Sequence, residues 1–164
     1  MQGDARVAEQ LRAFLMEELP AHPGFFKRLA IQALENEPPL SFLKNFVVER
    51  SGKHKDQFDI QLRGIAPLTD AVRVLALHAG IGETSTFLRL EQLAAHDPVQ
   101  QQLYEEAADT LTLLLRHRLK YALEEGGSGR YLNPDQLNRI ERQTLKYAFR
   151  TIGELQELIK NRFT

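Results

Sequence analysis

The sequence has no cysteine, and neither sign of charge predominates among its 164 residues. Without cysteine the chain cannot form a disulfide, bind a metal ion through thiolates or use a thiol as a nucleophile. Its 21 basic and 22 acidic residues give a formal net charge of -1. A domain that binds nucleic acids in general usually has a pI above about 9, so this balance argues against that class of protein.

Long apolar runs are also missing. No run approaches the ~20 residues that a helix needs to span a bilayer, and we expect a cytoplasmic protein without membrane contact. The five histidines are scattered and include no His-x-x-x-His pair, so the sequence predicts no metal site. A composition of 43% hydrophobic and 26% charged residues is typical of one globular domain, which we expect to comprise residues 1–164.

Helical periodicity predicts several short helices in the first hundred residues. One is expected from Asp4 to Leu19, and Pro23 begins a second that Pro38-Pro39 ends. A short helix or turn follows at about residues 41–45. Two more are expected over residues 67–78 and, after a break at two glycines, over residues 83–93.

The segment over residues 46–63 has a different pattern. Phe46–Arg50 is rich in β-branched and aromatic residues, Ser51–Asp56 is turn-like, and Gln57–Leu62 alternates polar and apolar side chains. We therefore predict a β-hairpin here, with a tight bend at Gly64. A lone hairpin is marginally stable in water, so we expect it to pack on the helices.

Two long helices are predicted in the C-terminal half. Asp97 and Asn133 each precede a proline, which is the pattern of an N-cap and a first helical residue. They predict helices over about residues 98–125 and 134–163, with a flexible link at Gly126–Gly129. Helices joined by such a loop usually pair antiparallel. The expected fold is all-α: an up-and-down helical bundle with two long antiparallel C-terminal helices and a small β-hairpin insertion.

Several segments, taken in order, resemble one protein family. They are Phe25-Phe26 with Leu29, Gly52-Lys53-His54-Lys55 followed by Phe58-Asp59-Ile60, the dense stretch Gly64–Leu77, Glu83-Thr84-Ser85-Thr86 and the closing stretch Asn133–Phe163. This set resembles the C-terminal putative nucleotidyltransferase substrate-binding domain of bacterial signalling proteins that carry CBS or cyclic-nucleotide-binding modules. The chain departs from the family pattern at Gln61 and Ser85, where lysine and asparagine are usual.

The resemblance implies an accessory domain. Nucleotidyl transfer needs carboxylates that hold Mg²⁺ against a triphosphate, and nucleotidyltransferases carry a Gly-Ser pair followed by Asp-x-Asp. That pattern is missing here, so we expect no catalytic residue and no catalysis by this chain alone. The resemblance implies an upstream nucleotidyltransferase domain in the same polypeptide, with Mg²⁺ and a nucleoside triphosphate bound in the parent protein. The Gly3-Asp4 start leads us to expect a fragment of a longer protein.

Polar side chains on the predicted helices are the candidates for substrate binding, because a guanidinium fork suits phosphate and carboxylate groups. The candidate residues are Asp70, Arg73, Arg116, Arg118, Lys146 and Arg150. Five of them have a structural alternative: a plain helix pair for Asp70 and Arg73, an internal ion pair for Arg118, and a solvated helix face for Lys146 and Arg150. A binding role predicts a concave basic site around Arg73, Arg118 and Lys146.

A second motif lies on the first of the two long helices. His117-Arg118-Leu119-Lys120 is similar to the phosphoacceptor motif of histidine phosphotransfer domains. However, Tyr121 stands where that motif needs a small residue, and the rest of the chain does not fit that family. We therefore expect His117 to be an ordinary exposed helix residue.

Two functions are compatible with these patterns. The first is the substrate-binding domain of a uridylyl- or adenylyltransferase-like protein, which holds the acceptor or the nucleotide for a separate catalytic domain. The second is a non-catalytic interaction or dimerisation module that relays a signal from CBS or cyclic-nucleotide-binding domains. The second function predicts a broad exposed apolar face and a symmetric homodimer.

Overall fold

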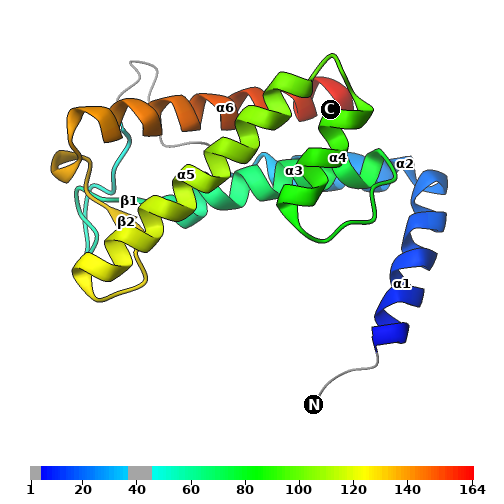
Figure 1. Ribbon diagram of the computed structural model, residues 1–164, viewed down its shortest axis with the longest axis horizontal. Helices are drawn as coiled ribbons and strands as arrows, with labels where there is room; N and C mark the ends of the chain where they lie inside the picture. The colour runs from blue at the N-terminus through cyan, green and yellow to red at the C-terminus, as the bar shows by residue number, and fades with distance from the viewer. Residues whose placement is uncertain (1–4, 37–45) are drawn as a thin grey trace.

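Helices form most of the computed structural model, which describes residues 5–36 and 46–164 (Figure 1). The α-helices are α1 (Ala5–Glu18), α2 (Pro23–Ala33), α3 (Ala66–His78), α4 (Thr86–His96), α5 (Gln101–Glu125) and α6 (Arg139–Phe163). Short connecting turns are the 3-10 turns η1 (Leu19–Ala21) and η3 (Pro134–Gln136) and the π-helical turn η2 (Gln61–Ile65). The predicted all-α fold is confirmed. Within the described residues, no helix is both long and apolar enough to cross a membrane.

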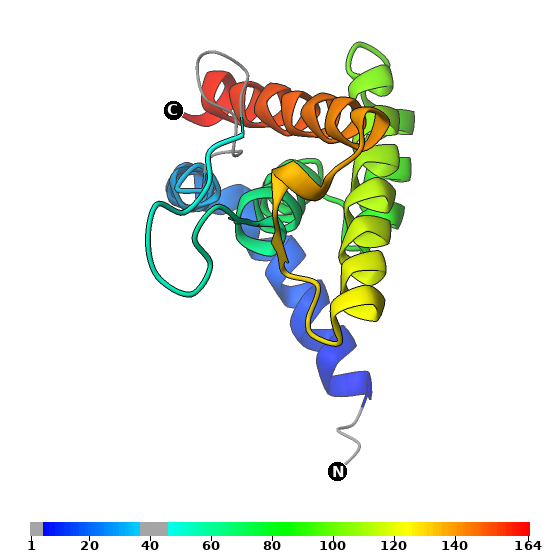
Figure 2. The same cartoon turned by 90° about the vertical axis from the view of Figure 1, so that its left-hand side faces the viewer.

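The two long helices, α5 and α6, run in opposite directions, as predicted. Near one end Arg162 forms an ion pair with Asp97 (Nη2 to Oδ2, 3.2 Å), and near the other end Lys120 pairs with Glu141 (Nζ to Oε1, 2.7 Å). Figure 1 shows the helices crossing near the end of α6 and splaying apart toward its beginning. Figure 2 shows α6 lying across the top of α5.

The hydrophobic core lies between α6 and the helices α3 and α5, on both of which α6 packs, and α4 also packs against α3 and α5. Apolar side chains at helical spacing fill it. They include Leu68, Val72 and Leu75 of α3, Leu90 and Leu93 of α4, Leu111 and Leu114 of α5, and Leu145, Ile152 and Leu155 of α6. Burying one such side chain contributes about 1.5–3 kcal/mol. Their spacing therefore determines which face of each helix turns inward.

The small β element exists, but its predicted pairing is wrong. Strand β1 (Phe58–Asp59) pairs antiparallel with β2 (Tyr131–Leu132), more than seventy residues later, rather than with residues 46–50. The 46–57 segment is a loop closed by the hydrogen bond from the Glu49 amide to the Gln57 carbonyl (2.8 Å). The long-range pair is favoured because Phe58 and Leu132 are both fully buried, which local alternation of side chains cannot indicate.

Gly64 does not make the predicted bend. It is buried within η2, which continues directly into α3, and the Ala66 amide donates to the Gln61 carbonyl five residues earlier. Pro67 has no amide hydrogen and would crowd an ordinary α-turn before it, so a wider π-turn fits here. A β-carbon added to Gly64 would lie 3.3 Å from side chains of both Leu114 and Phe149. This glycine therefore permits close packing of η2 on α5 and α6.

The predicted caps of the two long helices also need correction. Asp97 does not cap α5, which begins at Gln101, because its carboxylate pairs with Arg162 instead. Asn133 caps only the short turn η3, and α6 begins after Asn138, which forms a capping box with Glu141. Helix α2 ends at Ala33, before the predicted stop at Pro38-Pro39. That proline pair, the segment at 41–45 and the Gly3-Asp4 start lie outside the described residues.

The segment Gly126–Gly129 is more than the predicted flexible link. Gly126 ends α5 in the left-handed conformation (φ 68°), and the buried Gly129 adopts it again (φ 61°). A β-carbon added to Gly129 would lie 1.8 Å from the Arg118 carbonyl oxygen, so the backbone there packs directly on α5. The prediction is wrong at this residue, because only glycine fits both the conformation and the space.

Gly129→Ala should destabilise the fold by at least about 2 kcal/mol, because it combines left-handed backbone strain with a clash against α5. Gly127→Ala is the matched control, since nothing lies within 4 Å of a β-carbon added there, and it should change stability by less than about 0.5 kcal/mol. Urea unfolding measures both free energies. Equal, small effects of the two substitutions would contradict the close packing of Gly129.

Candidate functional site

A groove of about 740 Å³ lies between α5 and α6. Residues Asp109, Leu113 and Arg116 of α5 and Lys146, Tyr147 and Arg150 of α6 contribute to its walls. Its volume is in the range of about 300–1,000 Å³ that is usual for small-molecule sites. The splay of the two helices produces the groove, because their apolar faces pack inward while their polar faces remain open beside each other.

The structure brings three of the predicted site residues to this groove: Arg116, Lys146 and Arg150. The side chains of Arg116 and Arg150 are exposed, and neither makes an ion pair or hydrogen bond to any residue in the described part of the chain. Two unpaired guanidinium groups on facing helices make this wall of the groove positively charged. Such groups retain their full capacity to bind an anion.

Lys146 contributes differently. It is half-buried, and its ammonium nitrogen lies 5.8 Å from the centre of the Phe46 ring, a distance at which a cation and an aromatic face attract each other. Its charge therefore sits at the edge of the groove, above an aromatic side chain that also stacks on Phe58. The predicted solvated position is confirmed for Arg150, which is exposed, but not for Lys146, which is half-buried.

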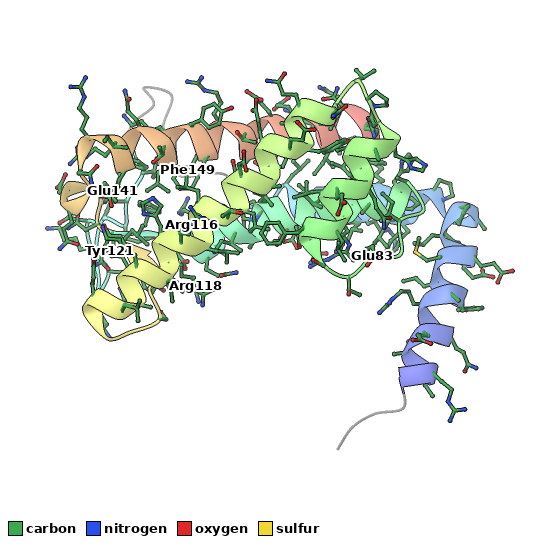
Figure 3. All side chains as sticks on the ribbon, in the orientation of Figure 1. Glu83, Arg116, Arg118, Tyr121, Glu141 and Phe149 are labelled. Carbon is green, nitrogen blue, oxygen red and sulfur yellow. The ribbon has the colours of Figure 1, made fainter. Side chains whose placement is uncertain are left out.

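Arg118 faces away from the groove. Its Nη1 donates to the Gln61 side-chain oxygen (2.6 Å) and its Nε to the Ser128 carbonyl (3.3 Å), which ties α5 to η2 and to the glycine segment. Figure 3 shows Arg118 on the edge of α5 that is farther from α6. Residues two positions apart lie on opposite sides of a helix, which explains why Arg116 and Arg118 separate. No described carboxylate pairs with Arg118, so the internal ion pair is not formed.

Asp70 and Arg73 lie elsewhere. They form an ion pair within α3 (Nη1 to Oδ1, 2.8 Å), which is the plain helix pair that was the structural alternative. With Leu29 and Gln32 they border a separate cavity of about 40 Å³, which has room for about one water molecule. The expected grouping of Arg73, Arg118 and Lys146 does not form, because the three side chains face different partners.

Two polar residues of the groove, Asp109 and Tyr147, add chemistry that the three predicted site residues there lack. Asp109 supplies a carboxylate that has no ion-pair partner among the described residues. Tyr147 presents a ring that is 49% exposed, and a hydrogen bond to the Glu106 carboxylate raises the pKa of its hydroxyl. Asp109 stands two helical turns before Arg116, and Tyr147 stands one turn before Arg150. This spacing, which places each residue on the same helix face as a predicted arginine, is the sequence feature that could have identified Asp109 and Tyr147.

Lys120, one turn beyond Arg116 on α5, forms an ion pair with Glu141 in the first turn of α6; Figure 3 labels Glu141 at that end of α6. His117 is buried beside this pair, and the prediction that it is exposed is wrong. It lies on the same helix face as the buried residues Leu114 and Tyr121, which turn toward the core. Burial lowers the pKa of His117, Glu141 opposes that shift and Lys120 adds to it, and Nδ1 has no hydrogen-bond partner in the described structure.

The described residues do not suit a metal ion. No group of three or more His, Cys, Asp or Glu side chains among them is arranged to hold one. Of the described residues that line the groove, only Asp109 carries a carboxylate, whereas Mg²⁺ on a nucleotide is usually held by one or two carboxylates together with the phosphates. The groove therefore offers mainly positive charge, hydrogen-bond donors and an aromatic ring.

A comparison with protein families gives one match. The model of a family described as "Putative nucleotidyltransferase substrate binding domain" matches residues 23–163. The match includes every described element from α2 to α6 and leaves out α1 and η1. Neither a curated protein nor a solved structure matches this chain.

When the pH is lowered from 7.5 to 5, the wild type should lose more free energy of unfolding than the His117→Gln variant loses over the same range. Because burial holds the pKa of His117 below the ordinary value of about 6.5, the unfolded chain binds a proton in this range that the folded chain does not. Urea unfolding at several pH values measures the difference, with the exposed His96→Gln as the control. Parallel pH profiles for wild type and His117→Gln would contradict the burial of a neutral imidazole.

Proposed function

The chain belongs to the family of putative nucleotidyltransferase substrate-binding domains, and we propose that its α5–α6 groove holds the acceptor or the nucleotide for a nucleotidyltransferase domain. The observation that carries the proposal is the pair Arg116 and Arg150. They face one groove of about 740 Å³ and have no ion-pair partner in the described chain. Phosphate and carboxylate groups are the natural partners of such guanidinium forks.

The other groove residues suit a nucleotide-like molecule. The exposed ring of Tyr147 offers a face on which a base can stack, and stacking on an aromatic side chain contributes about 1–3 kcal/mol per base. Asp109 can accept hydrogen bonds from an amino or hydroxyl group at the same time. An anionic molecule with an aromatic or polar part therefore fits this groove better than an apolar one.

The proposed role is binding and positioning rather than transfer. The sequence contains no Gly-Ser pair followed by Asp-x-Asp, so Mg²⁺ and the carboxylates that hold it would belong to the upstream domain of the same polypeptide. A binding domain accelerates transfer by fixing one reactant close to the other, which lowers the entropic cost of their encounter. Arg116 and Arg150 would do this by orienting an anionic group at the mouth of the catalytic cleft.

A second function is favoured by α1. Its apolar side chains are unusually exposed: Val7 by 61%, Leu11 by 67% and Phe14 by 60%. Helix α1 packs mainly on η1 and adds nothing to the core. An amphipathic helix with an open apolar face is typical of a surface that contacts another domain or another chain. A module that relays signals from CBS or cyclic-nucleotide-binding domains, as a homodimer or otherwise, would use such a surface.

A thermal-shift screen tests the groove. The domain is heated with Mg²⁺ and ATP, UTP, CTP or GTP, because a ligand at 100 times its dissociation constant adds about 2.7 kcal/mol of stability, or several degrees. The double variant Arg116→Ala/Arg150→Ala should lose most of that shift, since each lost charged hydrogen bond costs about 1.5–3 kcal/mol. Arg28→Ala removes an exposed arginine of α2 that does not line the groove; it is the control and should behave like the wild type.

Two outcomes would count against the proposal. A shift that survives in the double variant would place the nucleotide outside the groove. If no nucleotide shifts the wild type, the domain does not bind nucleotides by itself, and the acceptor becomes the ligand to test. Sedimentation of the same samples measures the oligomeric state. A homodimer would support the second function, the interaction module.

A further inference from the structure

Three arginines from different helices gather on the side of the molecule that α1 joins. They are Arg12 of α1, Arg73 of α3 and Arg89 of α4. The loop before α4 brings Arg12 close to Arg89: a β-carbon added to Gly82 would lie 3.9 Å from Cδ of Arg12, and the next residue, Glu83, accepts a hydrogen bond from Arg89. Figure 3 shows Glu83 below α4, beside the upper part of α1.

The guanidinium group of Arg89 is held in one orientation. Its Nε donates to the backbone carbonyl of Glu83 at 2.6 Å, and the side chain is half-buried. Its two terminal nitrogens make no hydrogen bond or ion pair within the described residues. A fixed fork with unused donors binds an anion with little loss of side-chain freedom.

The charges around Arg89 are not balanced. Burial lowers the pKa of Arg89, and the charges of Arg73 and Arg12 lower it further, whereas only Glu83 opposes them. The Asp70 carboxylate already pairs with Arg73, and Arg12 has no ion-pair partner among the described residues. Three cations beside two carboxylates leave a local excess of positive charge. Repulsion of this kind is relieved when an anion binds among the cations.

We propose that Arg12, Arg73 and Arg89 form a second anion site, separate from the α5–α6 groove, which binds a phosphate group. The group is either inorganic phosphate or the phosphate of a nucleotide. Phosphate suits the site because its oxygens accept hydrogen bonds from several guanidinium forks at once. Among the described residues, Arg12 and the terminal nitrogens of Arg89 have no hydrogen-bond or ion-pair partner, and Arg73 pairs only with Asp70. None of the three arginines lines the α5–α6 groove.

Binding at this site also fixes the position of α1. A phosphate that bridges Arg12 to Arg89 joins α1 to α3 and α4, to which its contacts are otherwise few. An isolated helix of this length is marginally stable in water, so its amide hydrogens should exchange more slowly once the phosphate binds. The anion therefore controls how firmly α1, with its exposed apolar face, is presented to a partner.

The experiment compares sodium phosphate with sodium chloride at equal ionic strength and pH 7. Two quantities are measured: the melting temperature, and amide hydrogen exchange in residues 5–18. Phosphate should raise the first and slow the second in the wild type. In Arg89→Met the slower exchange in residues 5–18 should require at least tenfold more phosphate, whereas Arg28→Met should respond like the wild type. Arg116→Ala/Arg150→Ala removes the α5–α6 groove as a phosphate site and should keep the slower exchange in residues 5–18.

Further arms separate the alternatives. If the phosphate group is what binds, AMP should act like phosphate and adenosine should have no effect. If phosphate has an effect and AMP has none, the free ion is the ligand. Arg12→Met, at an exposed position, repeats the test if Arg89→Met does not fold. The proposal is overturned if phosphate slows exchange in residues 5–18 no more than chloride does, or if that slowing is unchanged in the folded Arg89→Met or Arg12→Met protein.

Discussion

The return of the chain after α5 is the constraint on which the rest of the structure depends. Gly129 packs against the backbone of Arg118, the next residue Arg130 donates from Nε to the buried Asp59 carboxylate at 2.6 Å, and β2 then pairs with β1. Asp59 also accepts the Leu62 amide at the start of the π-turn. These contacts join two distant parts of the chain at one point and so determine where α6 begins.

The position of α6 in turn creates the groove. With α6 starting beside Lys120 and ending beside Asp97, the helices cross rather than pack along their whole length, and their polar faces remain open. The basic residues then serve two different purposes. Arg118 and Arg130 hold the chain reversal, while Arg116 and Arg150 stay unpaired within the described structure and face the groove. The proposed substrate-binding role rests on this difference between arginines that hold the fold and arginines that face the groove without a partner.

Sequence periodicity was sufficient to predict the helices and the antiparallel order of α5 and α6, because both depend on local spacing, and the resemblance of an ordered set of motifs was sufficient to indicate the family. Periodicity was insufficient for the partner of β1, which lies far along the chain, and for the cap of α6, where two asparagines five residues apart competed. The candidate list included Arg116, Lys146 and Arg150, but their separation from Arg73 and Arg118 depends on how the helices cross. That geometry is set by Gly64 and Gly129, whose tight packing has no sequence signature of its own.

The most direct test of the central claim is a ¹H–¹⁵N correlation titration of the labelled domain with the nucleotide that gives the largest thermal shift. Binding in the groove predicts that the amides of residues 109–116 and 143–150 change together and give one dissociation constant, because one ligand contacts both helices. Amides that change only around α1, α3 and α4, while those of the groove stay fixed, would contradict the assignment of the substrate site to α5 and α6.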